Sequence, residues 1–171
     1  IKAHFREELG QDLLLYEGGV ERHNLSFEVV PLSTAEKLER TNELIREHIA
    51  STDEPGGVIV YAATRNTTEE IRDFLNHHGL RAEAFHAGLD PGEKREIIEA
   101  FVEGDVPVIC ATNAFGMGID KENIRLVLHY QMPGSLENYI QEAGRAGRDL
   151  EPARCVLLYD PQDVALQVNM G

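Results

Sequence analysis

Residues 57–79 read GVIVYAATRNTTEEIRDFLNHHG, and this stretch is the clearest indication of the fold. Its first six residues form an uninterrupted apolar run, as expected of a strand that is covered on both faces of a sheet. The polar residues that follow lead into a helix with an apolar stripe, which Gly79 ends. That stripe consists of Ile71, Phe74, Leu75 and His78. A buried strand followed directly by an amphipathic helix is typical of a parallel α/β sheet.

The same alternation of strand and helix signals continues on both sides of this stretch. Strands are also predicted at 26–30, 81–86, 106–111, 125–130 and 153–159. Helices are predicted at 33–51, 67–78 and 135–147, from Asp90 onward, and as a short final helix from Asp160 onward. Ser33 and Glu36 have the spacing of a capping box, and Asp90 precedes Pro91 as an N-cap. We therefore expect an α/β fold with a mostly parallel sheet, helices on both faces, and ligands beyond the carboxyl ends of the strands.

The composition indicates a single globular domain. The chain has 171 residues, of which 42% are hydrophobic, and its apolar runs are too short to span a membrane. It starts without a methionine or a signal-peptide pattern, which predicts a piece of a longer intracellular protein of the cytoplasm, nucleoid or nucleus. Residues 1–25 are the least regular part, so we expect a linker from an upstream lobe there and the α/β domain at 26–171.

Neither the cysteines nor the histidines indicate a metal site. Cys110 and Cys155 both lie in apolar runs, which predicts reduced core thiols, and no pair of histidines or cysteines has metal-ligand spacing. The net charge of −14 is unusual for a nucleic-acid binder, which is ordinarily basic. Because the acidic residues are spread along the chain, any nucleic-acid contact has to be local. Salt adaptation and a basic protein partner both remain open as reasons for this charge.

Residues 141–149, QEAGRAGRD, form what we name the arginine segment. If the predicted helix continued through it, Gln141, Arg145 and Arg148 would stand at i, i+4 and i+7 and share one face. Guanidinium groups stay charged and offer a planar fork of donors, which suits a polyphosphate. The segment therefore predicts an arginine finger for nucleotide hydrolysis. The alternative is a surface helix with two solvated arginines.

Polar residues follow three of the predicted strands. Thr64 and Arg65 come at a helix start, where unpaired amide groups attract anions, although Asn66 or Thr67 could simply cap this helix. After the next strands come His86 with Gly88, and Thr112. These five residues, which we name the carboxyl-end cluster, predict a grip on the phosphates of a nucleic-acid strand. A purely structural role for His86 is the alternative.

The loop after Thr112 carries a second glycine-rich pattern. Gly116 and Gly118 remove side-chain bulk, and Asp120 is suited to accept hydrogen bonds from ribose hydroxyls or to orient an arginine. The chain has no G-x-x-x-x-G-K-[ST] pattern. It is therefore expected to offer arginines to a nucleotide that another domain holds.

Taken together, these motifs resemble the second RecA-like domain of a superfamily 2 helicase, and within that superfamily the RecQ family. The matching stretches are VIVYAATR (58–65), AFHAGL (84–89), ATNAFGMGIDKENIRLVLHY (111–130) and SLENYIQEAGRAGRD (135–149), and RHNL (22–25) is similar to the stretch that leads into the RecQ domain. The FGMGID and QEAGRAGRD forms differ from the ARGLD and HRIGRAGR forms of DEAD-box RNA helicases.

The resemblance implies a 3′ to 5′ DNA helicase in which ATP and Mg²⁺ sit between an upstream lobe and this domain. It implies that Arg145 and Arg148 reach the terminal phosphates, with Arg148 as the finger, and that Gln141 couples cleft closure to DNA. Gly118 and Asp120 correspond to the contacts for ribose and domain closure. The carboxyl-end cluster corresponds to positions that grip single-stranded DNA: Thr64, Arg65, His86, Gly88 and Thr112.

Three positions depart from the family pattern. Gly134 stands in place of a frequent basic residue, Gln131 in place of an aspartate, and Leu150 in place of a glycine. Two alternatives to a DNA helicase remain. One is a lobe of an RNA helicase or of a translocase that does not unwind nucleic acid. The other is a non-enzymatic RecA-like interaction module with acidic faces for a protein partner.

Overall fold

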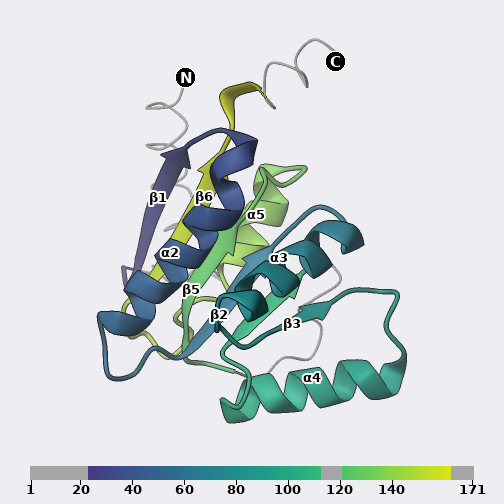
Figure 1. Cartoon of the computed structure of the whole chain (residues 1–171). Coiled ribbons are helices and arrows are strands. Elements are labelled where there is room, and N and C mark those ends of the chain that lie inside the picture. The colour runs from purple at the N-terminus through teal and green to yellow at the C-terminus, as the bar shows by residue number, and fades with distance from the viewer. Residues whose placement is uncertain (1–22, 113–120, 163–171) are drawn as a thin grey trace.

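A computed structural model describes residues 23–112 and 121–162, which form a six-stranded parallel sheet (Figure 1). The strands lie in the order β1-β6-β5-β2-β4-β3. Their bounds are β1 Leu25–Pro31, β2 Gly57–Tyr61, β3 Ala82–Phe85, β4 Val108–Ala111, β5 Ile124–His129 and β6 Ala153–Tyr159. All the predicted strands are confirmed, with shifts of one or two residues at their ends.

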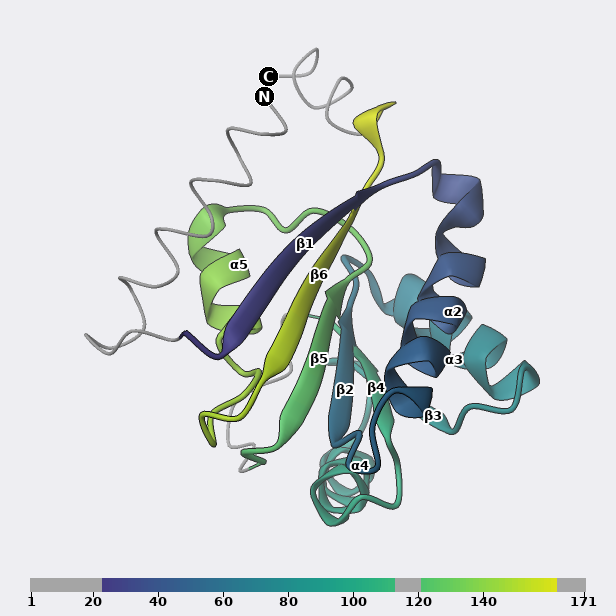
Figure 2. The same ribbon diagram turned by 90° about the vertical axis from the view of Figure 1, so that its left-hand side faces the viewer.

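Helices cover both faces of the sheet, as predicted. They are the 3-10 helix η1 Thr34–Glu36 and the α-helices α2 Lys37–Ala50, α3 Arg65–His77, α4 Pro91–Glu103 and α5 Leu136–Ala143. Figure 2 shows α5 on the opposite side of the sheet from α2 and α3. Side chains of α2 and α3 pack into one core layer, and those of α4 and α5 into the other. Within the described ranges, no helix is both long and apolar enough to cross a membrane.

The central strands alternate between these two core layers. On β2, Val58 and Val60 face α2 and α3, whereas Ile59 and Tyr61 face α4 and α5. Every residue of this strand is buried, because both of its faces are covered. Cys110 and Cys155 form no disulfide and are buried on opposite faces of the sheet, which confirms them as core thiols.

Several local predictions are confirmed. The Asp90 carboxylate accepts a hydrogen bond from the Glu93 amide at 2.8 Å and caps α4. Gly79 has a φ of +87°, and the amide of the next residue bonds back to the carbonyl of Leu75, which ends α3. The alternative that Asn66 or Thr67 caps α3 is wrong, because the N-cap is Thr64.

Two predictions about the first two helices need correction. The capping box is wrong, because Ser33 donates to the Glu36 carboxylate at 3.1 Å and makes no side-chain bond to a helix amide. Instead, the Asp160 carboxylate accepts from the Thr34 amide at 2.8 Å and from its hydroxyl at 2.7 Å. The predicted stripe of α3 is also wrong at His78, which is exposed and stacks on the half-buried Phe74.

The predicted extent of α5 is wrong at its carboxyl end. The helix ends at Ala143 instead of continuing to 147, and turns follow from 144 to 149. Gly147, with a φ of +59°, cannot continue a right-handed helix. The predicted helix after Asp160 includes only residues 161 and 162 within the described part, and its remainder lies outside it.

Candidate functional site

The carboxyl ends of β2, β3 and β4 bring the carboxyl-end cluster together. Thr64 is extended at the end of β2, and its hydroxyl accepts from the Thr67 amide at 3.2 Å. Arg65 is exposed at the first position of α3, where helix amide groups lack partners in the preceding turn. A cation and a helix start therefore face solvent at the same point, which is a suitable place for an anion.

His86 has two hydrogen bonds inside the protein. Its Nδ1 accepts from the Gly88 amide at 3.0 Å, so the ring proton resides on Nε2, which donates to Glu69 at 3.1 Å. The side chain is only 8% exposed. In this structure His86 therefore shapes the loop, and neither ring nitrogen is available as a donor to an external phosphate.

Gly88 lies between His86 and Arg65. A Cβ built on Gly88 would lie 3.0 Å from the His86 ring and 3.2 Å from Arg65 Nη1. Thr112 is buried beside them, and its amide donates to the carbonyl of Phe85. The structure thus brings together the residues that the sequence predicted from separate loops. It also adds Glu69, which sequence reasoning missed because no local pattern pairs a helix residue with a histidine 17 positions away.

The arginine segment lies against the starts of β5 and β6. The Gly147 amide donates to the carbonyl of Ile124 at 2.8 Å, and Asn24 Nδ2 donates to the Gly147 carbonyl at 2.8 Å. Asp149 forms an ion pair with Arg125. The segment is therefore fixed by the tertiary structure rather than by a helix, and sequence reasoning missed Asn24 and Arg125, which hold it. Asn24 carries no local signal, since its contact spans 123 positions.

The three predicted residues of the segment differ in exposure. Gln141 and Arg148 are exposed, and Arg145 is half-buried. Because α5 ends before both arginines, the prediction that they share one helix face with Gln141 is wrong. Among the described residues, neither arginine forms an ion pair with a carboxylate, so both remain available for an external anion.

Arg145 lies beside a buried tyrosine. Burial raises the pKa of the Tyr61 hydroxyl, the nearby Arg145 guanidinium opposes this rise, and the Glu142 carboxylate adds to it. The hydroxyl has no hydrogen-bond partner of ordinary geometry among the described residues. Arg145 therefore acts on it mainly through charge.

A second buried pair lies next to Tyr61. His129 is 1% exposed, and its Nε2 lies 3.0 Å from Glu142 Oε1, while its ring stacks on Tyr61 with centroids 5.2 Å apart. These two residues line a cavity of about 220 Å³ together with the loop that follows β5. Sequence reasoning missed both of them, because Glu142 reads as an ordinary charged helix residue and His129 as part of an apolar run.

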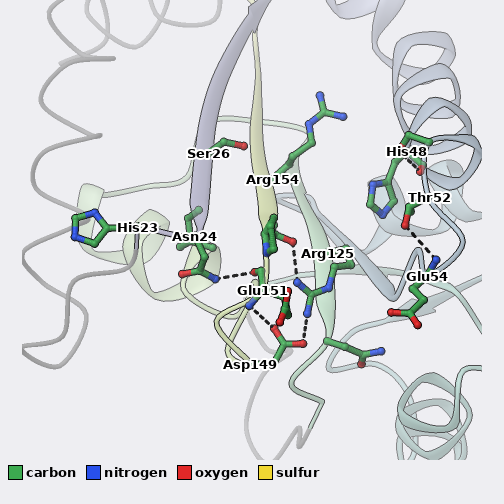
Figure 3. Close-up of a pocket in the computed structure, with 15 residues that line it drawn as sticks. His23, Asn24, Ser26, His48, Thr52, Glu54, Arg125, Asp149, Glu151 and Arg154 are labelled. Carbon is green, nitrogen blue, oxygen red and sulfur yellow. Dashed lines mark hydrogen bonds and ion pairs between the residues drawn. The ribbon is translucent and has the colours of Figure 1, made fainter.

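A larger cavity, of about 690 Å³, lies near the starts of β1, β5 and β6 (Figure 3). Its charged groups are largely paired: Arg125 binds Asp149, and Arg154 binds Glu28 at 2.9 Å. Burial lowers the pKa of His48, the hydrogen bond with the Pro55 carbonyl opposes this, and the charges of Arg154 and Arg125 lower the pKa further. This cavity is separate from the carboxyl-end cluster, and it adjoins the arginine segment through Asp149 and Asn24.

Gly116, Gly118 and Asp120 lie outside the described residues. Across residues 23–112 and 121–162, no group of three or more His, Cys, Asp or Glu side chains is arranged to hold a metal ion.

The fold and these loops define the class of protein. The structure of "Mss116p DEAD-box helicase domain 2 bound to an RNA duplex" superposes with a TM-score of 0.72 over 82% of this chain and 56% of that one, at 22% identity. The predicted α/β fold of the RecA-like type is therefore confirmed. Residues 36–150 match the helicase conserved C-terminal domain, and the chain belongs to this family.

The predicted resemblance to RecQ proteins is also confirmed. The chain is 44% identical over 149 residues to the "ATP-dependent DNA helicase RecQ" of Bacillus subtilis, covering 87% of this chain and 24% of the relative. It is 40% identical over 151 residues to the protein of the same name from Pasteurella multocida, covering 88% and 23%. The chain thus spans about a quarter of the length of these curated relatives.

Proposed function

We propose that this chain is the second motor lobe of a RecQ-like, ATP-dependent DNA helicase that moves 3′ to 5′. The observation that carries the proposal is the arginine segment, which presents Arg145 and Arg148 without carboxylate partners among the described residues. Guanidinium groups without carboxylate partners, on a turn that hydrogen bonds to Ile124 and Asn24 hold in place, suit a nucleotide held by a facing domain. Residues before Asn24 would connect to that upstream lobe.

The donor chemistry of the segment fits the terminal phosphates of ATP. Each guanidinium offers a planar fork of N–H groups and stays charged, and Arg148 is the more exposed. ATP and Mg²⁺ are assigned mainly to the upstream lobe, because this sequence lacks a phosphate-loop pattern. When bound, Mg²⁺ would neutralise charge on the phosphates. We assign ribose and domain-closure contacts to Gly118 and Asp120, and coupling of closure to DNA to Gln141.

The carboxyl-end cluster is proposed to grip the backbone of the DNA strand. Arg65 and the start of α3 supply the positive charge, and the absence of a side chain on Gly88 lets a phosphate come close. His86 contributes by holding the Gly88 amide, and Thr64 and Thr112 flank the site. A local grip of this kind is compatible with a net charge of −14, since the phosphate contacts are confined to a few loops.

The arginine finger is tested by Arg148→Ala in the longer protein that carries the upstream lobe. ATP hydrolysis should fall by roughly 10³-fold or more, the effect of removing an arginine finger. Arg81→Ala, at an exposed arginine before β3, is the matched control and should hydrolyse ATP normally. An Arg148→Ala protein with normal hydrolysis would remove the basis of the proposal.

The substrate is tested by comparing single-stranded DNA and RNA as activators of hydrolysis. Stimulation by DNA alone supports the RecQ-like motor. Equal stimulation by RNA would favour an RNA helicase or a translocase, and none by either would favour an interaction module. Arg65→Ala should weaken DNA binding regardless of sequence and reduce the salt slope by about one. An unchanged slope would contradict the backbone grip.

A further inference from the structure

The Glu142 side chain is largely buried, although Glu142 is the second residue of the arginine segment. Its side chain is 14% exposed, whereas the neighbouring Gln141 is exposed. The carboxylate meets His129 Nε2 at 3.0 Å, and the imidazole lies between the rings of Tyr61 and Tyr139, with centroids at 5.2 and 4.7 Å. A charged group is rarely buried in this way unless a partner compensates its desolvation, so Glu142 depends on His129.

Two further polar atoms, on His129 and Tyr61, are buried and make no hydrogen bond of ordinary geometry to another described residue. They are the Tyr61 hydroxyl and His129 Nδ1. Buried polar atoms that make no hydrogen bond destabilise a fold, and each one calls for an explanation other than stability. Apolar side chains at these positions would avoid this destabilisation. The polar group Tyr61–His129–Glu142 therefore indicates a functional role.

One end of this group reaches the arginine that is proposed to contact ATP. The Arg145 amide donates to the Glu142 carbonyl at 3.3 Å, and the Arg145 guanidinium and Glu142 carboxylate both act on the Tyr61 hydroxyl. Beyond Ala143 the segment has no helix to hold it. Arg145 and Glu142 therefore share the Tyr61 hydroxyl as a neighbour, in addition to their backbone hydrogen bond.

The other end reaches the loops that are proposed to grip DNA. His129 is the last residue of β5, and it pairs with Tyr61 at the end of β2. Two residues further on, the Gln131 side chain accepts from the Ala63 amide at 2.8 Å, immediately before Thr64. The cavity of about 220 Å³ between these loops leaves room for them to shift relative to α5.

We propose that Glu142 is a positioning residue that, through His129, couples the orientation of Arg145 to the strand-gripping loop after β2. The inference rests on the proposed function and assigns a role to residues outside the predicted site. Movement of the Ala63–Thr64 loop on binding DNA would displace the end of β5 and His129. Because the Glu142 carboxylate is hydrogen-bonded to His129, it would move with the imidazole and redirect Arg145 toward the nucleotide.

The coupling is tested by ATP hydrolysis of the longer protein with and without single-stranded DNA. In Glu142→Ala the ratio of the two rates should fall roughly 3- to 30-fold, the range of coupling through packed networks. Glu142→Gln keeps an acceptor for His129 Nε2 and should retain most of the ratio. Glu137→Ala, at an exposed glutamate of the same helix, is the matched control and should behave as the unchanged protein. A purely structural defect would lower both rates equally and leave the ratio unchanged, which would overturn the proposal.

A second readout does not depend on hydrolysis. In NMR spectra of this 171-residue chain, the buried His129 Nε2 proton should give a resolved downfield signal in the unchanged protein and in Glu142→Gln. Glu142→Ala should lose that signal and shift the Arg145 Nε–H resonance, and Glu137→Ala should change neither. An unshifted Arg145 resonance, or a Glu142→Gln protein as impaired as Glu142→Ala, would refute the coupling. If DNA did not stimulate hydrolysis by the unchanged protein, both the proposed function and this coupling would be refuted.

Discussion

Gly147→Ala should destabilise the chain more than an alanine at any open left-handed glycine, because the arginine segment has no room for a side chain. Gly147 has a φ of +59°. A Cβ there would lie 2.5 Å from Asn24 Nδ2, 3.0 Å from the Glu151 carbonyl oxygen and 3.1 Å from Ala153 Cβ. Asn24 is held by two hydrogen bonds, to the carbonyls of Gly147 and Glu151, and it cannot move aside without losing them.

The magnitude follows from three contributions. A left-handed conformation costs a residue with a Cβ roughly 1–2 kcal/mol, and the lower unfolded-state entropy of alanine offsets about 0.4–1 kcal/mol of that. Overpacking of a well-filled site adds about 1–3 kcal/mol. Gly147→Ala should therefore lower the free energy of unfolding by about 1–5 kcal/mol.

Gly104→Ala is the matched control for the backbone contribution. Gly104 has a φ of +90°, and a Cβ there would meet nothing within 4 Å, so this change should cost only about 0.5–1 kcal/mol. Urea unfolding of the 171-residue chain followed by circular dichroism gives both values, and an unchanged m-value would show that the unfolded states are comparable. Equal losses of stability for the two variants would refute the packing argument.

A double-mutant cycle identifies the obstacle. Asn24→Ala removes two hydrogen bonds, each worth about 0.5–1.5 kcal/mol, but it also removes the atom closest to the added Cβ. Gly147→Ala should consequently cost less in the Asn24→Ala background than in the unchanged chain. Strict additivity would show that Asn24 is not the group that excludes a side chain at this position.

Three further predictions concern stability and reactivity. The hydrogen bonds from Thr34 lower the pKa of Asp160. The Asp160 carboxylate therefore stabilises the fold above its unfolded-state pKa, and this stabilisation is lost as the pH falls through its folded-state pKa. Asp160→Asn should consequently flatten the acid-unfolding curve below about pH 4. Leu150 has a φ of +69° and is 65% exposed, so Leu150→Gly should raise Tm by about 1–4 °C by calorimetry, and a lower Tm would contradict this. Burial raises the pKa of the Cys110 thiol, and Cys155 is buried as well. A thiol reagent should therefore label both cysteines only after unfolding.

The alternation of strands and helices could be predicted from the sequence because hydrophobic periodicity is a local property. The strand predicted at 153–159 matches β6 Ala153–Tyr159, and Asp90 caps α4 as its position next to Pro91 indicates. The meeting of Arg65, His86 and Gly88 was also predictable, because the carboxyl ends of parallel strands share one edge of the sheet.

The tertiary structure alone decided where the arginine segment leaves its helix and which groups hold it. Gly147 bonds to Ile124 and Asn24, contacts that are distant in the sequence and that no periodicity encodes. The same holds for the burial of Glu142 against His129, whose two side chains meet only after α5 packs on the sheet. Local sequence thus determined which elements form and which residue types they carry. The packing of those elements decided how the side chains are oriented, because orientation depends on partners that become neighbours only in the folded chain.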